Sequence, residues 1–119
     1  MVAKRARVRI INELTADSNL TVHCKSKNID MGIRKIRYGE FFEFKVWPHF
    51  LGTNLFSCGM VWEDYSTTHY FEIYKGNRDI KSCSVCWWVI KISGPCMLNY
   101  KTREFDICYV WNNKTKTGI

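Results

Sequence analysis

Four of the six cysteines lie in the C-terminal third of the chain, and they constrain its fold more than any other feature. They are Cys83, Cys86, Cys96 and Cys108, and their surroundings have the β-branched and aromatic composition of short strands. Cysteines in such segments are typical of staples in a small exported sheet domain rather than of a reactive site. The pattern therefore favours recognition over catalysis.

Alternation of apolar and polar residues dominates the rest of the chain. In residues 20–24 and 42–46, apolar side chains recur at every second position, as one half-buried strand face requires. Further strands are predicted at Arg7 to Asn12, Leu55 to Trp62, Tyr70 to Tyr74, Val85 to Ile92 and Ile107 to Trp111. Turns are predicted at 17–19, 31–32, 38–40, 47–48, 76–79 and 93–95.

Seven to nine short strands must stack or close on themselves, because a single sheet would leave an apolar face and two edges open. We predict an all-β fold, a small disulfide-stapled β-sandwich of antiparallel strands, with a small barrel as the alternative. Residues 85–92 are apolar on both faces, which indicates a central strand. A length of 119 residues suits one domain, 1–119.

One disulfide can be predicted from the spacing. Cys96 and Cys108 are equally far from Thr102, which lies in a predicted hairpin turn, so the two cysteines should face each other across the ladder. The Cα separation of directly opposed residues suits a disulfide. We therefore predict the pair Cys96–Cys108, which would contribute about 3 kcal/mol in the chain-entropy model.

The other pairs are less determined. In an extended segment, Cys83 and Cys86 would lie about 10 Å apart on opposite faces, too far to bond each other. Each is therefore expected to pair with Cys24 or Cys58, in either of two arrangements. A zinc site would need a second short pair of ligands, and a redox motif would need a helix after the first cysteine; neither is indicated, so no metal is expected.

No catalytic site is predicted. His23, His49 and His69 are the candidates for acid–base chemistry near neutral pH, as in a nuclease that pairs two histidines, but none lies in a recognisable signature. Hydrolase, metalloprotease and phosphate-loop motifs are absent from the sequence. We expect no enzymatic activity, no cofactor and no small-molecule substrate.

Two glycosylation sequons, at Asn19 and Asn113, favour the secretory route. The basic N-terminal residues are not followed by the apolar region of a signal peptide, so an exported protein would have had its leader removed or replaced. No apolar run is long enough to span a membrane. We expect a secreted, extracellular monomer.

A net charge of +7 is spread along the chain. It suits an acidic partner, such as a wall polysaccharide, a phospholipid surface or an acidic receptor loop. The alternative is that the charge only keeps the protein in solution.

An ordered series of motifs resembles a known family. It includes Leu20 to Lys27, Tyr38 to Glu40 before Phe42 to Phe44, Gly52 to Cys58, Cys83-x-x-Cys86-Trp87, Gly94 to Cys96 and Asp106 to Tyr109. Together these motifs resemble the plant self-incompatibility S-protein family over residues 8–112. The acidic run that the family carries before its glycine is reduced here to the single carboxylate of Asp30 before Gly32.

The resemblance implies a small secreted β-sandwich without enzymatic activity, whose founding members act as pistil ligands of a membrane protein on pollen. It also implies a membrane receptor as the partner, and partner recognition by variable hydrophilic loops. The matching loop here is Gly76, Asn77, Arg78 and Asp79, followed by 80–82. An ordinary hairpin loop is the other interpretation of this segment.

Two alternatives to a receptor ligand remain. A basic secreted defence protein would act on membranes or nucleic acid through its charge, although the cations are not concentrated in one segment and nucleic acid is not the expected partner. A histidine-dependent nuclease is the third class. Binding through charge should fall steeply with salt, and a nuclease should lose RNA cleavage when a single histidine is replaced. Loop-mediated recognition predicts neither result.

Overall fold

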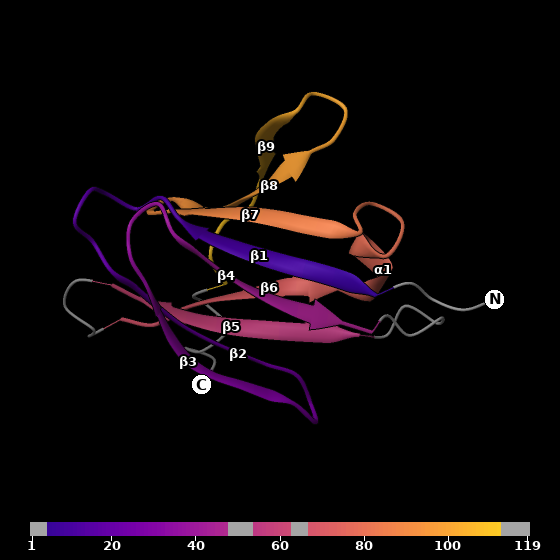
Figure 1. Ribbon diagram of the computed structural model, residues 1–119, viewed down its shortest axis with the longest axis horizontal. Coiled ribbons are helices and arrows are strands. Elements are labelled where there is room, and N and C mark those ends of the chain that lie inside the picture. Colours follow the sequence, from indigo (N-terminus) through magenta and orange to yellow (C-terminus); the bar gives the residue numbers. More distant parts are fainter. Residues whose placement is uncertain (1–4, 48–53, 63–66, 113–119) are drawn as a thin grey trace.

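The computed structural model describes residues 5–47, 54–62 and 67–112 of the chain, and these residues form two packed β-sheets (Figure 1). One sheet has the strand order β4-β1-β7-β8-β9 and the other has the order β3-β2-β5-β6. The strands are β1 (Ala6–Asn12), β2 (Leu20–Lys25), β3 (Asp30–Ile36), β4 (Phe41–Val46), β5 (Leu55–Val61), β6 (His69–Lys75), β7 (Val85–Lys91), β8 (Gly94–Asn99) and β9 (Glu104–Cys108). The predicted β-sandwich is confirmed.

Buried side chains alternate along β1 and β2, as predicted for residues 20–24. In β1, Ala6, Val8, Ile10 and Asn12 are buried, and the intervening side chains are partly exposed on the outer face. β7 lies at the centre of its sheet, paired with β1 and β8, which confirms the prediction drawn from its two apolar faces. The pairing of β1 with β7 is parallel, whereas the other pairings are antiparallel.

Asn12 is the polar side chain that ties the two sheets together at one end. It is fully buried, and its Nδ2 donates to the backbone oxygens of Ser18 and Ile36 at 2.7 and 2.9 Å. Its Oδ1 accepts from the backbone N–H of Leu14 at 3.0 Å. The bond to Ile36 joins the end of β1 to the end of β3, and the bonds to Ser18 and Leu14 hold the loop between β1 and β2. The buried amide is thus hydrogen-bonded at both its nitrogen and its oxygen without a charge.

Three elements differ from the sequence prediction. Residues 31–32, predicted as a turn, lie inside β3, an edge strand with mostly exposed side chains. An edge strand needs no regular apolar face, and charged residues and glycine are common there. Gly94 and Pro95, also predicted as turn residues, begin β8, where a proline at the start of a strand is tolerated. The last strand ends at Cys108 rather than Trp111.

The pairing of Cys96 with Cys108 is confirmed, whereas the expected pairing of the other four cysteines is wrong. Cys24 bonds Cys58, which lies directly opposite on β5 at a Cα separation of 4.0 Å. Cys83 bonds Cys86 at a Cα separation of 5.2 Å. Because a helical turn and a bend precede β7, the chain is not extended between 83 and 86, and the 10 Å expectation does not apply.

Gly94 is required by close contact with the segment that follows β9. Its φ is +146°, and a Cβ added to it would lie 2.1 Å from the backbone oxygen of Tyr109. We expect Gly94→Ala to lower the free energy of unfolding by about 2–3 kcal/mol, measured by urea unfolding, because backbone cannot move aside as a flexible side chain can. Gly39→Ala is the control, since that glycine also has a positive φ but open space around it, and should cost about 1 kcal/mol. Equal losses would contradict this account.

Candidate recognition site

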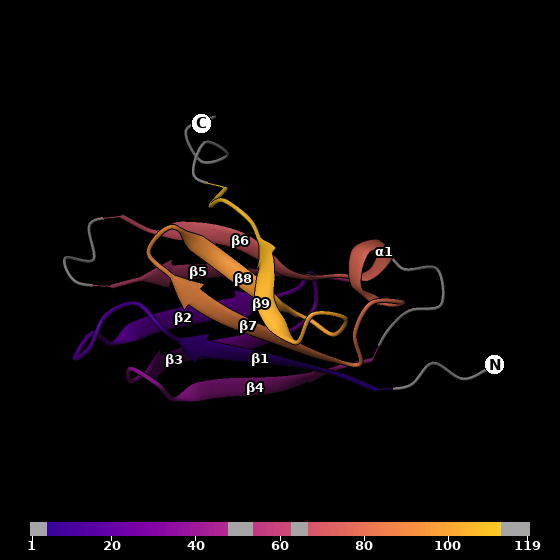
Figure 2. The ribbon, with the colours of Figure 1, turned by 90° about the horizontal axis from the view of Figure 1, so that it is seen from above.

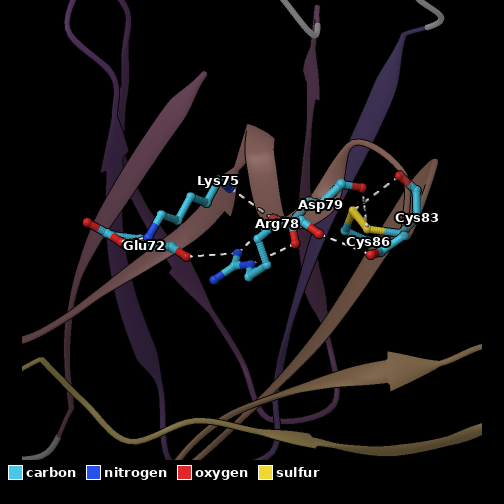
Figure 3. Close-up of polar contacts among 7 residues, drawn as sticks. Glu72, Lys75, Arg78, Asp79, Cys83 and Cys86 are labelled. Atoms are coloured by element: carbon cyan, nitrogen blue, oxygen red, sulfur yellow. Dashed lines mark hydrogen bonds and ion pairs between the residues drawn. A yellow bond between two sulfur atoms is a disulfide. The ribbon is translucent and has the colours of Figure 1, made fainter. Parts of the chain in front are cut away.

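The candidate site is the connection between β6 and β7, which lies at one end of the sandwich (Figure 2). It begins with a single helical turn, α1 (Gly76–Asp79), where the sequence predicted an irregular polar loop. Asp79 is fully buried, and its Oδ2 accepts from the backbone N–H of Lys75 at 2.9 Å. The Arg78 guanidinium donates to both carboxylate oxygens of Asp79 at 2.7 Å (Figure 3). The carboxylate is thus paired and hydrogen-bonded, as a buried charge must be.

Arg78 points inward as well. One of its terminal nitrogens donates to the backbone oxygen of Glu72 at 3.1 Å. Its guanidinium carbon lies 5.3 to 5.6 Å from the ring centroids of three mutually packed aromatic residues, Phe71, Trp88 and Tyr109. These distances are within the range of cation–π attraction. The ion pair therefore anchors the turn to aromatic rings from both sheets and from the segment after β9.

The Cys83–Cys86 disulfide fixes the second half of the connection. The backbone oxygen of Asp79 accepts from the N–H groups of Ser82 and Cys83 at 2.9 and 3.1 Å. The Ser84 oxygen accepts from the backbone N–H of Arg7 on β1 at 2.8 Å. The segment 76–86 is thus held from within by an ion pair, a disulfide and backbone hydrogen bonds.

The outer side of this segment is polar. Of the four residues predicted to recognise a partner, Asn77 is exposed, Gly76 and Asp79 are buried, and Arg78 is largely occupied by its internal contacts. Beyond the helical turn, Lys81, Ser82 and Ser84 are exposed. Partner recognition by this segment stays a prediction, and we name the exposed side chains at 77, 81, 82 and 84 the display surface.

Tyr74 lies at the C-terminal end of β6, just before the helical turn, and it is fully buried. Burial raises the pKa of its phenol, and the nearby Asp79 carboxylate raises it further. The phenol is therefore protonated at neutral pH, so Tyr74 adds no second negative charge beside Asp79.

The structure places His23 on the outer face of the second sheet. Its Nε2 lies 2.6 Å from Oδ1 of Asp30, and the same oxygen accepts from the backbone N–H of Gly32 at 2.8 Å. The Gly32 hydrogen bond, together with His23, lowers the pKa of the Asp30 carboxyl. The pair is partly exposed to solvent, and His23 also lines a shallow surface hollow of about 360 Å³ on this face.

Of the other two histidines, His69 lies among the described residues. The His69 ring stacks on Trp62 with the ring centroids 4.3 Å apart, and His49 lies outside the described residues. Within 5–47, 54–62 and 67–112, no three acidic, histidine or cysteine side chains are close enough to hold a metal ion. In the same ranges, no helix is long and apolar enough to cross a membrane.

Asn19, one of the two sequon asparagines, is exposed in the loop that precedes β2. A glycan could be attached there without disturbing the core. Asn113 lies outside the described residues.

Fold and site together define a class: a small β-sandwich, stapled by three disulfides, that holds a polar surface turn in a fixed conformation. Residues 7–111 match the model of the family described as plant self-incompatibility protein S1. The chain therefore belongs to this family.

Curated relatives agree with this membership. S-protein homolog 2 of Arabidopsis thaliana is 40% identical over 110 residues, which cover 88% of this chain and 67% of the relative. S-protein homolog 3 of the same plant is 38% identical over 114 residues, covering 92% and 75%. The names of these relatives describe no enzymatic reaction.

A solved structure shares the fold. It is described as that of SPH (Self-Incompatibility Protein Homologue) proteins, "a widespread family of small, highly stable, secreted proteins from plants". The TM-score is 0.61 at 19% sequence identity, and the match covers 80% of this chain and 84% of the other.

Proposed function

We propose that this protein is a secreted, non-enzymatic ligand that binds a membrane receptor through its display surface. One observation carries the proposal: the segment 76–86 is fixed from within, by the Arg78–Asp79 pair and the Cys83–Cys86 disulfide, while Asn77, Lys81 and Ser82 are exposed. A surface loop held rigidly loses little conformational entropy when it binds. This is the arrangement expected of a recognition element on a stable scaffold.

Secretion is part of the same proposal. Disulfides persist in oxidising compartments, and all six cysteines of this chain are paired in three bridges. The exposed sequon at Asn19 and the description of the structural relative as secreted also support it.

The experiment measures saturable binding of the fluorescently labelled, disulfide-bonded protein to plant protoplasts. The test variant combines Asn77→Ala with Lys81→Glu, and the control is Lys91→Glu, an exposed charge reversal on β7 at the other end of the sandwich. We expect the test variant to lose at least about tenfold in affinity, with an unchanged thermal midpoint, because its altered side chains lie outside the core. The control should bind like the unaltered protein.

Unchanged binding by the test variant would contradict the assignment of the display surface. Binding that is equally strong to protein-free anionic vesicles and falls steeply with salt would instead favour the basic defence protein.

A further inference from the structure

A groove of about 690 Å³ opens at the same end of the sandwich as α1. Its walls come from the turn between β2 and β3, the end of β4 and the beginning of β5. The backbone oxygen of Asn54, which lines the groove, accepts from the N–H of Gly76 at 2.9 Å, so groove and helical turn adjoin. Figure 1 shows α1, the end of β4 and the β2–β3 turn on the same side of the molecule.

Three large apolar side chains line this groove and remain accessible. Ile29, Trp47 and Leu55 are 50%, 67% and 42% exposed. They come from three different segments, so it is the fold that brings them together and not one apolar run in the sequence. Exposed apolar residues that are grouped and surrounded by polar ones mark interaction surfaces.

The surrounding charge is positive. Lys25, Lys27 and Lys45 line the groove, and the guanidinium of Arg5 lies 5.2 Å from the Trp47 ring centroid. No acidic side chain lies among the described residues that line it. Within residues 5–47, 54–62 and 67–112, no acidic side chain forms an ion pair with Lys27 or Lys45. The groove thus combines accessible apolar side chains with a positive electrostatic potential. A partner that carries carboxylates would be attracted to it.

We propose that this lysine groove binds an acidic peptide segment that carries one large apolar side chain, presented by a protein partner. The volume suits a few residues rather than a whole domain. Among the described residues that line it, Trp47 is the one highly exposed aromatic ring, whereas single-stranded nucleic acid is bound by successive stacking rings. This proposal rests on the proposed ligand function. It names the chemistry of the partner segment that would bind beside the display surface.

The test uses the full disulfide-bonded chain and three synthetic probes in calorimetric titrations. The first is a peptide of alternating glutamate and serine with one central leucine, the second replaces that leucine with alanine, and the third replaces each glutamate with lysine. We expect the first to bind, the second to bind at least about fivefold more weakly, and the third not to bind.

Two variants probe the groove itself. Combining Lys27→Glu with Lys45→Glu should lower the affinity for the leucine peptide at least about tenfold. Leu55→Ser should weaken binding of the leucine peptide but leave the alanine peptide unaffected. The matched control, Lys35→Glu with Lys91→Glu, changes the net charge equally on exposed strand positions away from the groove and should leave affinity within about twofold.

Equal effects of the two double charge reversals would overturn the proposal, as would equal binding of the leucine and alanine peptides. Tighter binding of single-stranded RNA or phosphatidylglycerol vesicles than of the leucine peptide would also overturn it. If the groove variants keep full binding to protoplasts while the display-surface variant loses it, the groove proposal fails and the ligand function stands. If protoplast binding is never saturable, the ligand function fails whatever the peptides show.

Discussion

Replacing Asp79 with asparagine should lower the free energy of unfolding by about 3–5 kcal/mol, because the guanidinium of Arg78 would lose its charged partner in a largely buried place. The Asp79 carboxylate is fully buried and also accepts from the backbone N–H of Lys75. An amide can accept that bond but cannot balance the positive charge among the rings. Equilibrium unfolding in guanidinium chloride, compared with the unaltered protein, measures the loss.

Asp106→Asn is the matched control, since Asp106 is exposed and bonds the Thr102 hydroxyl at 2.8 Å. It should change the unfolding free energy by less than about 1 kcal/mol. A second test combines Asp79→Asn with Arg78→Met, and the double variant should lose less than the sum of the single losses, because no charge is then left unpaired. Additive losses, or a control as destabilised as Asp79→Asn, would show that the pair does not act as a unit.

Removal of the Cys24–Cys58 disulfide, by replacing both residues with alanine, should lower the unfolding free energy by about 4 kcal/mol. The bridge spans a sequence separation of 34, the longest of the three, and cross-linking distant residues restricts the unfolded chain most. Both cysteines are also fully buried between the sheets. Denaturant midpoints under non-reducing conditions measure the effect.

The other two bridges provide an internal scale. The same model gives about 3 kcal/mol for Cys96–Cys108, with a separation of 12, and less than about 2 kcal/mol for Cys83–Cys86, with a separation of 3. The three loops do not overlap along the chain, so their effects should be separable. If loss of Cys83–Cys86 destabilised the protein more than loss of Cys24–Cys58, chain entropy would not explain the order.

Much of the fold could be predicted because local patterns and tertiary packing agree. The alternation in β1 and β4 reflects one buried face, and the two apolar faces of β7 reflect its central place in the sheet. The symmetry of Cys96 and Cys108 about Thr102 predicts a hairpin in which the two face each other, and the structure confirms that pairing, although a bulge shifts the register by one residue nearer the turn, where Asn99 pairs with Glu104. Each of these signals depends on neighbours close in sequence.

The errors occur where distant contacts decide the structure. β3 has almost no buried face, because it lies at an edge, so its residues carry no periodic signal. The pairing of Cys24 with Cys58 depends on the register of β2 against β5, and nothing within either segment specifies it.

The position of the candidate site can be predicted from the sequence, but the orientation of its side chains cannot. Residues 76–79 were identified as a polar loop, yet Arg78 and Asp79 are its anchors and face inward. Adjacent arginine and aspartate residues can form an ion pair, but the sequence does not show that this pair faces inward. The three aromatic rings that surround Arg78 come from separate parts of the chain and meet only in the folded protein. The lysine groove gave no sequence signal, since its cations and apolar residues converge only in the folded protein.

The position of β1 affects how the chain can fold during synthesis. β1 is made before the other described strands, but it is inserted between β4 and β7, and β7 is made only after β2 to β6. Until residues 85–91 have left the ribosome, one edge of β1 is unpaired and Val8 and Ile10 lack part of their final packing. Pairing between segments so far apart slows folding and prolongs exposure of an aggregation-prone edge. Hydrogen exchange should therefore find the β2–β5 ladder protected before the β1–β7 ladder in refolding chains.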